Sequence, residues 1–121
     1  MKMKFIGIVG SRKRNTDADY KIVEQEFFKI YEQGDTIVSG GCPSGADHFA
    51  ELIAKKYGIT IKIFPPEWEK YGKIAGFLRN TDIAKTSEVL IACIATDRKG
   101  GTEDTINKFK KSHTVGRVIL C

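Results

Sequence analysis

The sequence predicts an α/β fold in three layers, in which a parallel sheet of about five strands carries helices on both faces. Short runs rich in β-branched residues alternate with segments of helical period, and each pair occupies roughly 30 residues. Several of the runs are almost continuously apolar, as parallel strands covered on both faces are. Glycine-bearing turns follow these runs, which places the turns along the edge where open α/β sheets bind ligands.

The five expected strands are the runs Lys4–Val9, Asp35–Ser39, Thr60–Phe64, Glu88–Ala95 and Arg117–Leu120. The segment between the first two runs has an apolar stripe of helical period, formed by Tyr20, Val23, Phe27, Ile30 and Tyr31. We expect Asp17 to cap this first helix and Gly34 to stop it. The helix is therefore amphipathic, with one side facing the core.

The second helix has the clearest period, because Ala46, Phe49, Ala50, Ile53, Ala54 and Tyr57 recur at spacings of three and four, and Gly58 ends it. A third helix is expected over Ile74–Lys85. A fourth is expected over Thr102–Lys111, with Ile106 and Phe109 facing inward. Right-handed crossovers and short connections then favour the Rossmann-like strand order 3-2-1-4-5, with the switch point between the first and fourth strands.

The 121 residues and their 41% hydrophobic content suit one compact domain, which we expect to span residues 1–121. The net charge of +5 favours anionic ligands, but the basic residues are scattered rather than gathered in a track for nucleic acid. Three separated cysteines without a C-x-x-C pair indicate a reducing, cytoplasmic setting, and Cys93 is expected in the core. No apolar segment is long enough for a membrane span, no metal cluster is visible, and no cofactor is expected.

The predicted turns have the residue types that bind phosphate. Glycines let a ligand approach the peptide plane, serine and threonine add hydroxyl donors, and Arg12 offers a planar fork. Tight turns alone would also explain the glycines. Neither G-x-G-x-x-G nor G-x-x-x-x-G-K-[ST] occurs, which disfavours ordinary dinucleotide enzymes and P-loop NTPases.

Four segments together resemble the SLOG superfamily, in particular its small single-domain branch related to YspA and YpsA. They are Gly10-Ser11-Arg12, Ser39-Gly40-Gly41-x-x-x-Gly45-Ala46-Asp47, Pro66-x-Trp68-x-x-Tyr71-Gly72-Lys73-x-Ala75-Gly76-x-x-Arg79-Asn80 and Gly101-Thr102. The resemblance spans almost the whole chain and implies a Rossmann-like domain that binds a nucleotide or nucleotide-derived molecule, as a sensor or a sequestering protein.

This resemblance implies a ligand site composed of Gly10, Ser11, Arg12, Ser39, Gly40, Gly41, Gly45, Asp47, Trp68, Arg79, Asn80, Gly101 and Thr102. Arg79 would clamp a phosphate or, alternatively, form a surface salt bridge, and Asn80 would recognise a base or ribose. Trp68 would stack on a base or close the core beneath its loop. Asp47 would accept hydrogen bonds from ribose hydroxyls or cap backbone amides at a helix N-terminus.

A second function comes from LOG-like phosphoribohydrolases of the same superfamily, which release a base from a nucleoside monophosphate. The loop Gly101-Thr102-Glu103-Asp104-Thr105 resembles their acidic motif, with Asp104 on the first acid position and Thr105 on the second. Glu103 or Asp104 would then be the catalytic acid and Arg79 the anchor. The same two acids also suit the first turn of any helix.

Two further expectations concern partners. Subunit pairing is usual among the LOG-like relatives, and it implies a homodimer through an apolar face at the third helix and the Trp68 loop. The DprA family, a more distant relative, handles DNA, so binding of single-stranded nucleic acid is a third candidate function, although the basic residues form no evident groove.

Overall fold

A computed structural model describes residues 3–98, 100–113 and 117–121 of the chain. The strands are β1 (Phe5–Gly10), β2 (Thr36–Ser39), β3 (Ile61–Ile63), β4 (Val89–Cys93) and β5 (Arg117–Leu120). They form one sheet in the order β3-β2-β1-β4-β5, and every neighbouring pair is parallel. This confirms the predicted fold class and strand order. All five carboxyl ends therefore lie along one edge.

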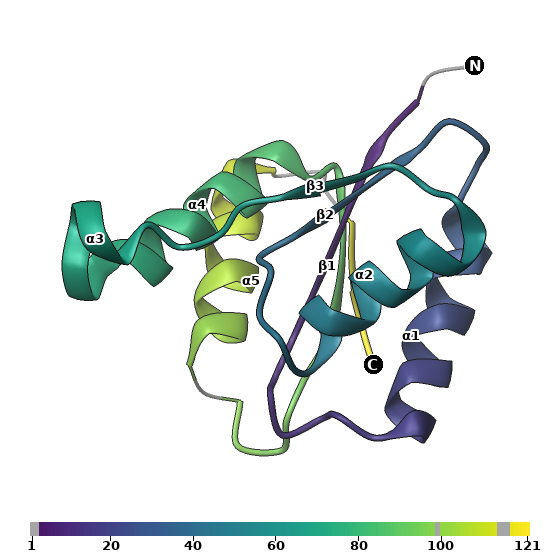
Figure 1. Cartoon of the computed structure of the whole chain (residues 1–121), viewed down its shortest axis with the longest axis horizontal. Helices are drawn as coiled ribbons and strands as arrows, with labels where there is room; N and C mark the ends of the chain where they lie inside the picture. The colour runs from purple at the N-terminus through teal and green to yellow at the C-terminus, as the bar shows by residue number, and fades with distance from the viewer. Residues whose placement is uncertain (1–2, 99, 114–116) are drawn as a thin grey trace.

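The helices lie on both faces of the sheet (Figure 1). Helices α1 (Asp17–Ile30) and α2 (Ala46–Tyr57) pack on one face, and α4 (Ala75–Thr86) and α5 (Gly101–Ser112) pack on the other. The short helix α3 (Trp68–Tyr71) and the 3₁₀ turn η1 (Gly72–Ile74) precede α4 and project from the body in this view. Among the described residues, no helix has both the length and the apolarity needed to cross a membrane.

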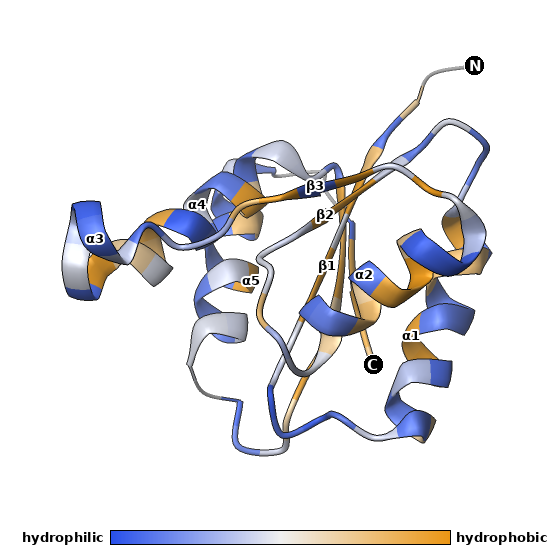
Figure 2. Cartoon of the chain, in the orientation of Figure 1, coloured by the Kyte–Doolittle hydropathy of each residue, from blue (hydrophilic) through white to orange (hydrophobic). Residues whose placement is uncertain are grey.

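Alternate strand residues supply the two cores, because successive side chains of a strand point to opposite faces. Ile6 and Ile8 of β1 join Phe27 of α1 on one face, whereas Val9 joins Phe109 of α5 on the other. Cys93 is fully buried in the first cluster, as the sequence predicts. Figure 2 shows apolar residues concentrated in the central strands, whereas hydrophilic and apolar residues alternate along the helices.

The predicted ends of the first helix are wrong. Thr16, not Asp17, caps α1: its Oγ1 accepts a hydrogen bond from the Asp19 amide (3.1 Å), and Asp19 Oδ2 accepts one from the Thr16 amide (3.2 Å). This reciprocal pair is a capping box, with aspartate where glutamate or glutamine is usual. The helix ends at Ile30 rather than at Gly34, which lies in the turn before β2 with φ of 97°.

The later helices differ from prediction mainly in what precedes α4. Helices α4 and α5 match their predicted ranges to within one residue at each end, and Gly58 ends α2 in the left-handed conformation (φ 67°). The segment with α3 and η1 was not predicted. It lengthens the connection between β3 and α4 and contains Trp68 and Tyr71, which are both exposed.

Candidate functional site

A cavity of about 330 Å³ opens at the carboxyl edge of the sheet, beside the ends of β1 and β4 where the strand order reverses. We call it the edge cavity. It is lined by Val9, Gly10, Ser11, Arg12, Lys13, Cys42, Asp47, Arg79, Asn80, Ile83, Gly101, Thr102 and Thr105. The loops after β1 and β2 and the helices α2, α4 and α5 all contribute to it, which is the usual arrangement of ligand sites in open α/β sheets.

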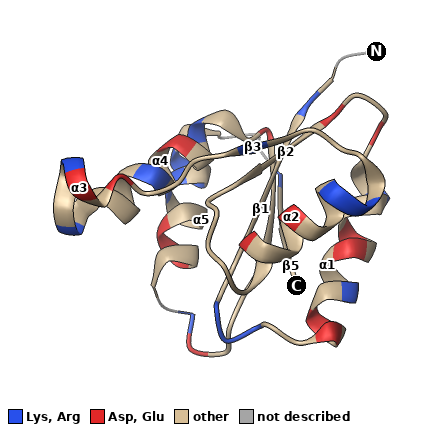
Figure 3. Ribbon diagram, in the orientation of Figure 1, with Lys and Arg blue, Asp and Glu red and all other residues tan. Residues whose placement is uncertain are grey.

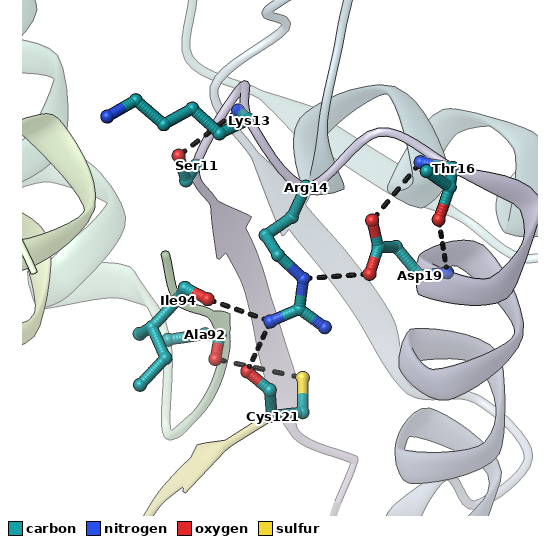
Figure 4. Close-up of polar contacts among 8 residues, drawn as sticks. All are labelled: Ser11, Lys13, Arg14, Thr16, Asp19, Ala92, Ile94 and Cys121. Atoms are coloured by element: carbon teal, nitrogen blue, oxygen red, sulfur yellow. Dashed lines mark hydrogen bonds and ion pairs between the residues drawn. The ribbon is translucent and has the colours of Figure 1, made fainter. Parts of the chain in front are cut away.

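The loop after β1 is held in place by Arg14 (Figure 4). Its Nε donates to Asp19 Oδ1 (2.7 Å), and its Nη1 donates to the carbonyl oxygens of Ile94 (2.7 Å) and Cys121 (3.1 Å). The adjacent Arg12 is exposed and lines the edge cavity. Arg14 therefore has a structural role, and Arg12 is the arginine of this loop that lines the edge cavity.

Helices α2 and α5 both begin beside the edge cavity at a glycine with positive φ. Gly45 has φ 75° and ψ −157°, and Gly100 has φ 88° and ψ −151°. Glycine has no side chain to cap either helix, and among the described residues no side chain bonds the amides of the first three residues of α2 or α5, although the Gly45 amide itself donates to Asn15 Oδ1 (2.8 Å). Free amides and the helix dipole favour an anion at such an end.

Arg79 of α4 connects the site across three elements. Its Nη1 donates to the carbonyl oxygen of Gly40 (2.7 Å), and its Nε donates to Asn80 Oδ1 (2.9 Å). The buried Asn80 in turn donates from Nδ2 to the carbonyl oxygen of Gly101 (3.3 Å) and to Asp104 Oδ2 (3.1 Å). Within the described residues Arg79 forms no ion pair, so the surface salt bridge considered for it is not found.

Asp47 is the acidic residue of the edge cavity. It is only 8% exposed, and its Oδ2 accepts a hydrogen bond from the Cys42 amide (3.2 Å). Burial raises the pKa of Asp47 to about 6, against the lowering effects of the Cys42 amide and of the positive charges on Arg79 and Arg12. The carboxyl group therefore changes its charge close to neutral pH.

The structure brings many of the predicted ligand residues to one place. Those that line the edge cavity are Gly10, Ser11, Arg12, Asp47, Arg79, Asn80, Gly101 and Thr102. Lys13, Cys42 and Thr105 also line it, together with Val9 and Ile83, although the sequence reasoning did not select them. Helical spacing would have found two of them, because Ile83 lies one turn beyond Arg79 and Thr105 lies three residues beyond Thr102.

Four of the predicted ligand residues lie outside the lining of the edge cavity and contact neighbouring protein atoms instead. Ser39 is fully buried and donates from Oγ to the Asp47 carbonyl oxygen (3.3 Å). A Cβ on Gly40 would lie 2.3 Å from Arg79 Nη1, and one on Gly45 would lie 2.7 Å from the Ser11 carbonyl oxygen. A Cβ on Gly41 would meet Ile63 Cγ2 at 2.9 Å. Glycine is thus required at Gly41 and Gly45, which also have positive φ (76° and 75°), whereas the nearest atoms to Gly40 are the ends of the Arg79 and Asp47 side chains.

Trp68 and the two predicted catalytic acids lie outside the lining of the edge cavity. Trp68 is on α3 and 55% exposed. Glu103 accepts two hydrogen bonds from Arg98, at 2.7 and 2.9 Å. Asp104 pairs with Lys108 (2.9 Å) and reaches the site only through Asn80. Each acid is thus paired with a cation of its own helix or of the preceding loop.

The charge of the edge cavity favours an anion, since Arg12, Lys13 and Arg79 line it against the single carboxyl group of Asp47. Lys13 also pairs with Asp97. Elsewhere the basic residues are spread over helices and loops with acidic residues between them (Figure 3). Among the described residues, no three His, Cys, Asp or Glu side chains are grouped to hold a metal ion.

Comparison of the chain with models of known families, with curated proteins and with solved structures gave no match.

Proposed function

We propose that the edge cavity binds the phosphate portion of a nucleotide or nucleotide-derived molecule, and that the protein acts as a sensor or sequestering protein for that ligand. The observation that supports this proposal most directly is the convergence of three cationic side chains and two helix N-termini that begin at glycine on one cavity. Its volume of about 330 Å³ falls within the range of roughly 300–1,000 Å³ that is typical of small-molecule sites. The sequence resemblance to the SLOG superfamily supports the same ligand class.

Each part of the site would have a distinct task. The amides at the start of α5 and the Ser11 hydroxyl would donate to phosphate oxygens. Arg79 already has two of its five N–H donors in use, and its position is thereby fixed. The remaining donors are free for a phosphate at little entropic cost. The exposed Arg12 would neutralise phosphate charge at the opening of the edge cavity.

The test begins with a pool of nucleoside mono- and diphosphates, dinucleotides and ADP-ribose, which is incubated with the protein, ultrafiltered and analysed by chromatography. We expect one compound to be depleted without a new peak. For that compound, Arg79→Ala should weaken binding by roughly 10- to 100-fold, as expected for loss of a charged hydrogen bond. An unchanged pool, or unchanged affinity of Arg79→Ala, would overturn the proposal.

Arg117→Ala is the matched control for this experiment. Arg117 is exposed at the start of β5, where it pairs in register with Val89 at the opposite edge of the sheet. Its removal changes the net charge as Arg79→Ala does. A loss of affinity in both variants would indicate a general charge effect rather than a phosphate clamp.

A second candidate is hydrolysis of the glycosidic bond of a nucleoside phosphate, and one observation favours it. Asp47 provides the cavity with a buried carboxyl group whose pKa is raised to about 6, which suits a general base. It would accept a proton from water as the water oxygen bonds to the anomeric carbon and the base departs. Appearance of a free base and a ribose phosphate in the same chromatogram would establish this reaction. Asp47→Asn should then abolish turnover, whereas Asp104→Asn should retain it if Asp47 is the base.

The expected homodimer remains a prediction. Trp68, Ile74 and Phe77 on the segment from α3 to α4 are each more than half exposed, which is unusual for large apolar side chains and is consistent with pairing of two copies. Light scattering across a range of protein concentrations would test it. A monomer mass throughout would contradict it.

A further inference from the structure

A second cavity, of about 560 Å³, lies on the other side of Arg79, beneath the segment that includes α3. We call it the arm cavity. It is lined by Ile63, Phe64, Pro65, Glu67, Lys70, Tyr71, Ala75, Leu78, Arg79, Thr81 and Asp82. Arg79 is the residue that it shares with the edge cavity, so the two spaces adjoin at this side of α4.

The loop after β2 also runs between the two cavities. Gly40 holds Arg79 through its carbonyl oxygen and approaches Asp47, which lines the edge cavity. The next residue, Gly41, lies against Ile63, which lines the arm cavity. A side chain at either glycine would occupy the space at this boundary, because a Cβ there would lie within 3 Å of these neighbours. The boundary between the two cavities is therefore formed by direct contacts between protein atoms, and a side chain at either glycine would displace the residues that separate the cavities.

The two cavities differ in chemistry. The edge cavity has an excess of cations, whereas Glu67 and Asp82 balance Lys70 and Arg79 in the arm cavity. The arm cavity also contains aromatic and aliphatic surface from Phe64, Tyr71, Ala75 and Leu78. Phosphate is thus favoured in the first space and a neutral planar ring in the second. The carboxylates of Glu67 and Asp82 can accept hydrogen bonds from amino groups on such a ring.

We propose that the ligand is a dinucleotide, with its phosphates in the edge cavity and one purine base in the arm cavity. This inference rests on the proposed function and specifies its ligand class. The arm cavity is the larger space, so a ligand confined to the edge cavity would leave most of the available surface to solvent. Arg79, placed between the two spaces, contacts the phosphates at the point where the second nucleoside begins.

The test uses three probes that differ only beyond the diphosphate: ADP, ADP-ribose and diadenosine diphosphate, with the corresponding guanosine compounds run in parallel. Trp68 is the only tryptophan and lies on α3 between residues that line the arm cavity, so its fluorescence reports occupation of that space. We expect the dinucleotide of at least one series to bind about tenfold more tightly than its diphosphate. We expect only that dinucleotide to change Trp68 emission.

Two tyrosine variants make the test specific. Tyr71→Ala should reduce dinucleotide affinity to that of the diphosphate while leaving diphosphate affinity unchanged. Tyr57→Ala is the matched control, because Tyr57 on α2 is 44% exposed, much like Tyr71 at 42%, and does not line the arm cavity. Equal affinity for diphosphates and dinucleotides would overturn the inference and leave the proposed function standing. Failure of every probe to bind would overturn both.

Discussion

Helix α1 and the helices α2 and α5 begin in opposite ways, although each follows a strand of the same sheet. The first turn of α1 is closed by its own side chains, through the reciprocal hydrogen bonds of Thr16 and Asp19. Helices α2 and α5 begin at Gly45 and Gly100, and in the described part of the chain the only side chain that accepts from a backbone amide at either start is Asn15, which accepts from the Gly45 amide. A cap of the first kind stabilises a helix by about 1 kcal/mol.

The start of α1 thus contributes to stability through its cap, whereas the starts of α2 and α5 leave backbone amides that can bind an anion. Both uncapped ends contribute residues to the edge cavity, Asp47 from α2 and Gly101 from α5. The capped end of α1 contributes none to its lining. A missing cap is therefore informative when it occurs at two helices that meet at one cavity.

The largest effect is expected from alanine at the glycine caps. Both glycines have dihedral angles that are almost exclusive to glycine, which costs alanine about 1–3 kcal/mol. At Gly45 the new Cβ would also lie 2.7 Å from the Ser11 carbonyl oxygen, whereas at Gly100 nothing lies within 4 Å. We expect Gly45→Ala to lower the free energy of unfolding by about 3 kcal/mol, and Gly100→Ala by clearly less. Chemical denaturation checks both, and equal losses would show that backbone strain alone matters.

The next effect concerns the acid in the first turn of α2. Because the pKa of Asp47 is raised to about 6 in the folded state, folding favours the protonated group. The stabilisation that results from this pKa shift is fully present below the ordinary pKa of aspartate, near 4, and it is lost as the pH rises through about 6. Relative to Asp47→Asn, the unfolding free energy of the native chain should fall by roughly 2 kcal/mol from pH 4 to pH 7. Denaturation of both proteins across this range measures it, and parallel curves would contradict the raised pKa.

The smallest effect is expected at the capped helix. Thr16→Ala removes the side chain that accepts from the Asp19 amide and should cost about 1 kcal/mol of stability. Ligand affinity should stay within twofold of the native value, because Thr16 does not line the edge cavity. Denaturation and a binding titration provide the two readouts. A large loss of affinity would mean that this cap also positions the loop that contains Arg12.

Sequence reasoning predicted the strand order and the edge at which the turns meet, because both depend on the alternation of strands and helices, whereas Asp47, Arg79 and Asn80 were selected by the resemblance to the SLOG motifs. Alternating βα units leave few topologies, and the turns after parallel strands must share one edge. The cap of α1 was assigned to Asp17 because both Thr16 and Asp17 are cap-forming types. The partner of Thr16 is Asp19, whereas the usual capping box has glutamate or glutamine at this position, so the motif is not recognised in the sequence.

The helix α3 and the pairing of Glu103 depend on local geometry and contacts that residue spacing in the sequence does not reveal. The helix α3 has only four residues, too few for a helical period. Glu103 is paired by Arg98, which precedes α5 with φ of 52°, an orientation that sequence does not predict. The Asp104–Lys108 pair, by contrast, has i,i+4 spacing and could have been anticipated. Two candidate catalytic acids were thus selected by motif although their surroundings pair them with cations.

The contacts of Arg14 have a consequence for folding during synthesis. The loop after β1 is made early, yet Arg14 fixes it to the carbonyl oxygen of Cys121, 107 positions later in the chain. Cys121 follows β5 directly, and its amide bonds back to Ala92 of β4. A nascent chain that has not yet added β5 therefore lacks one anchor of this loop. The loop that lines the edge cavity therefore acquires its full set of Arg14 contacts only after β5 has joined the sheet.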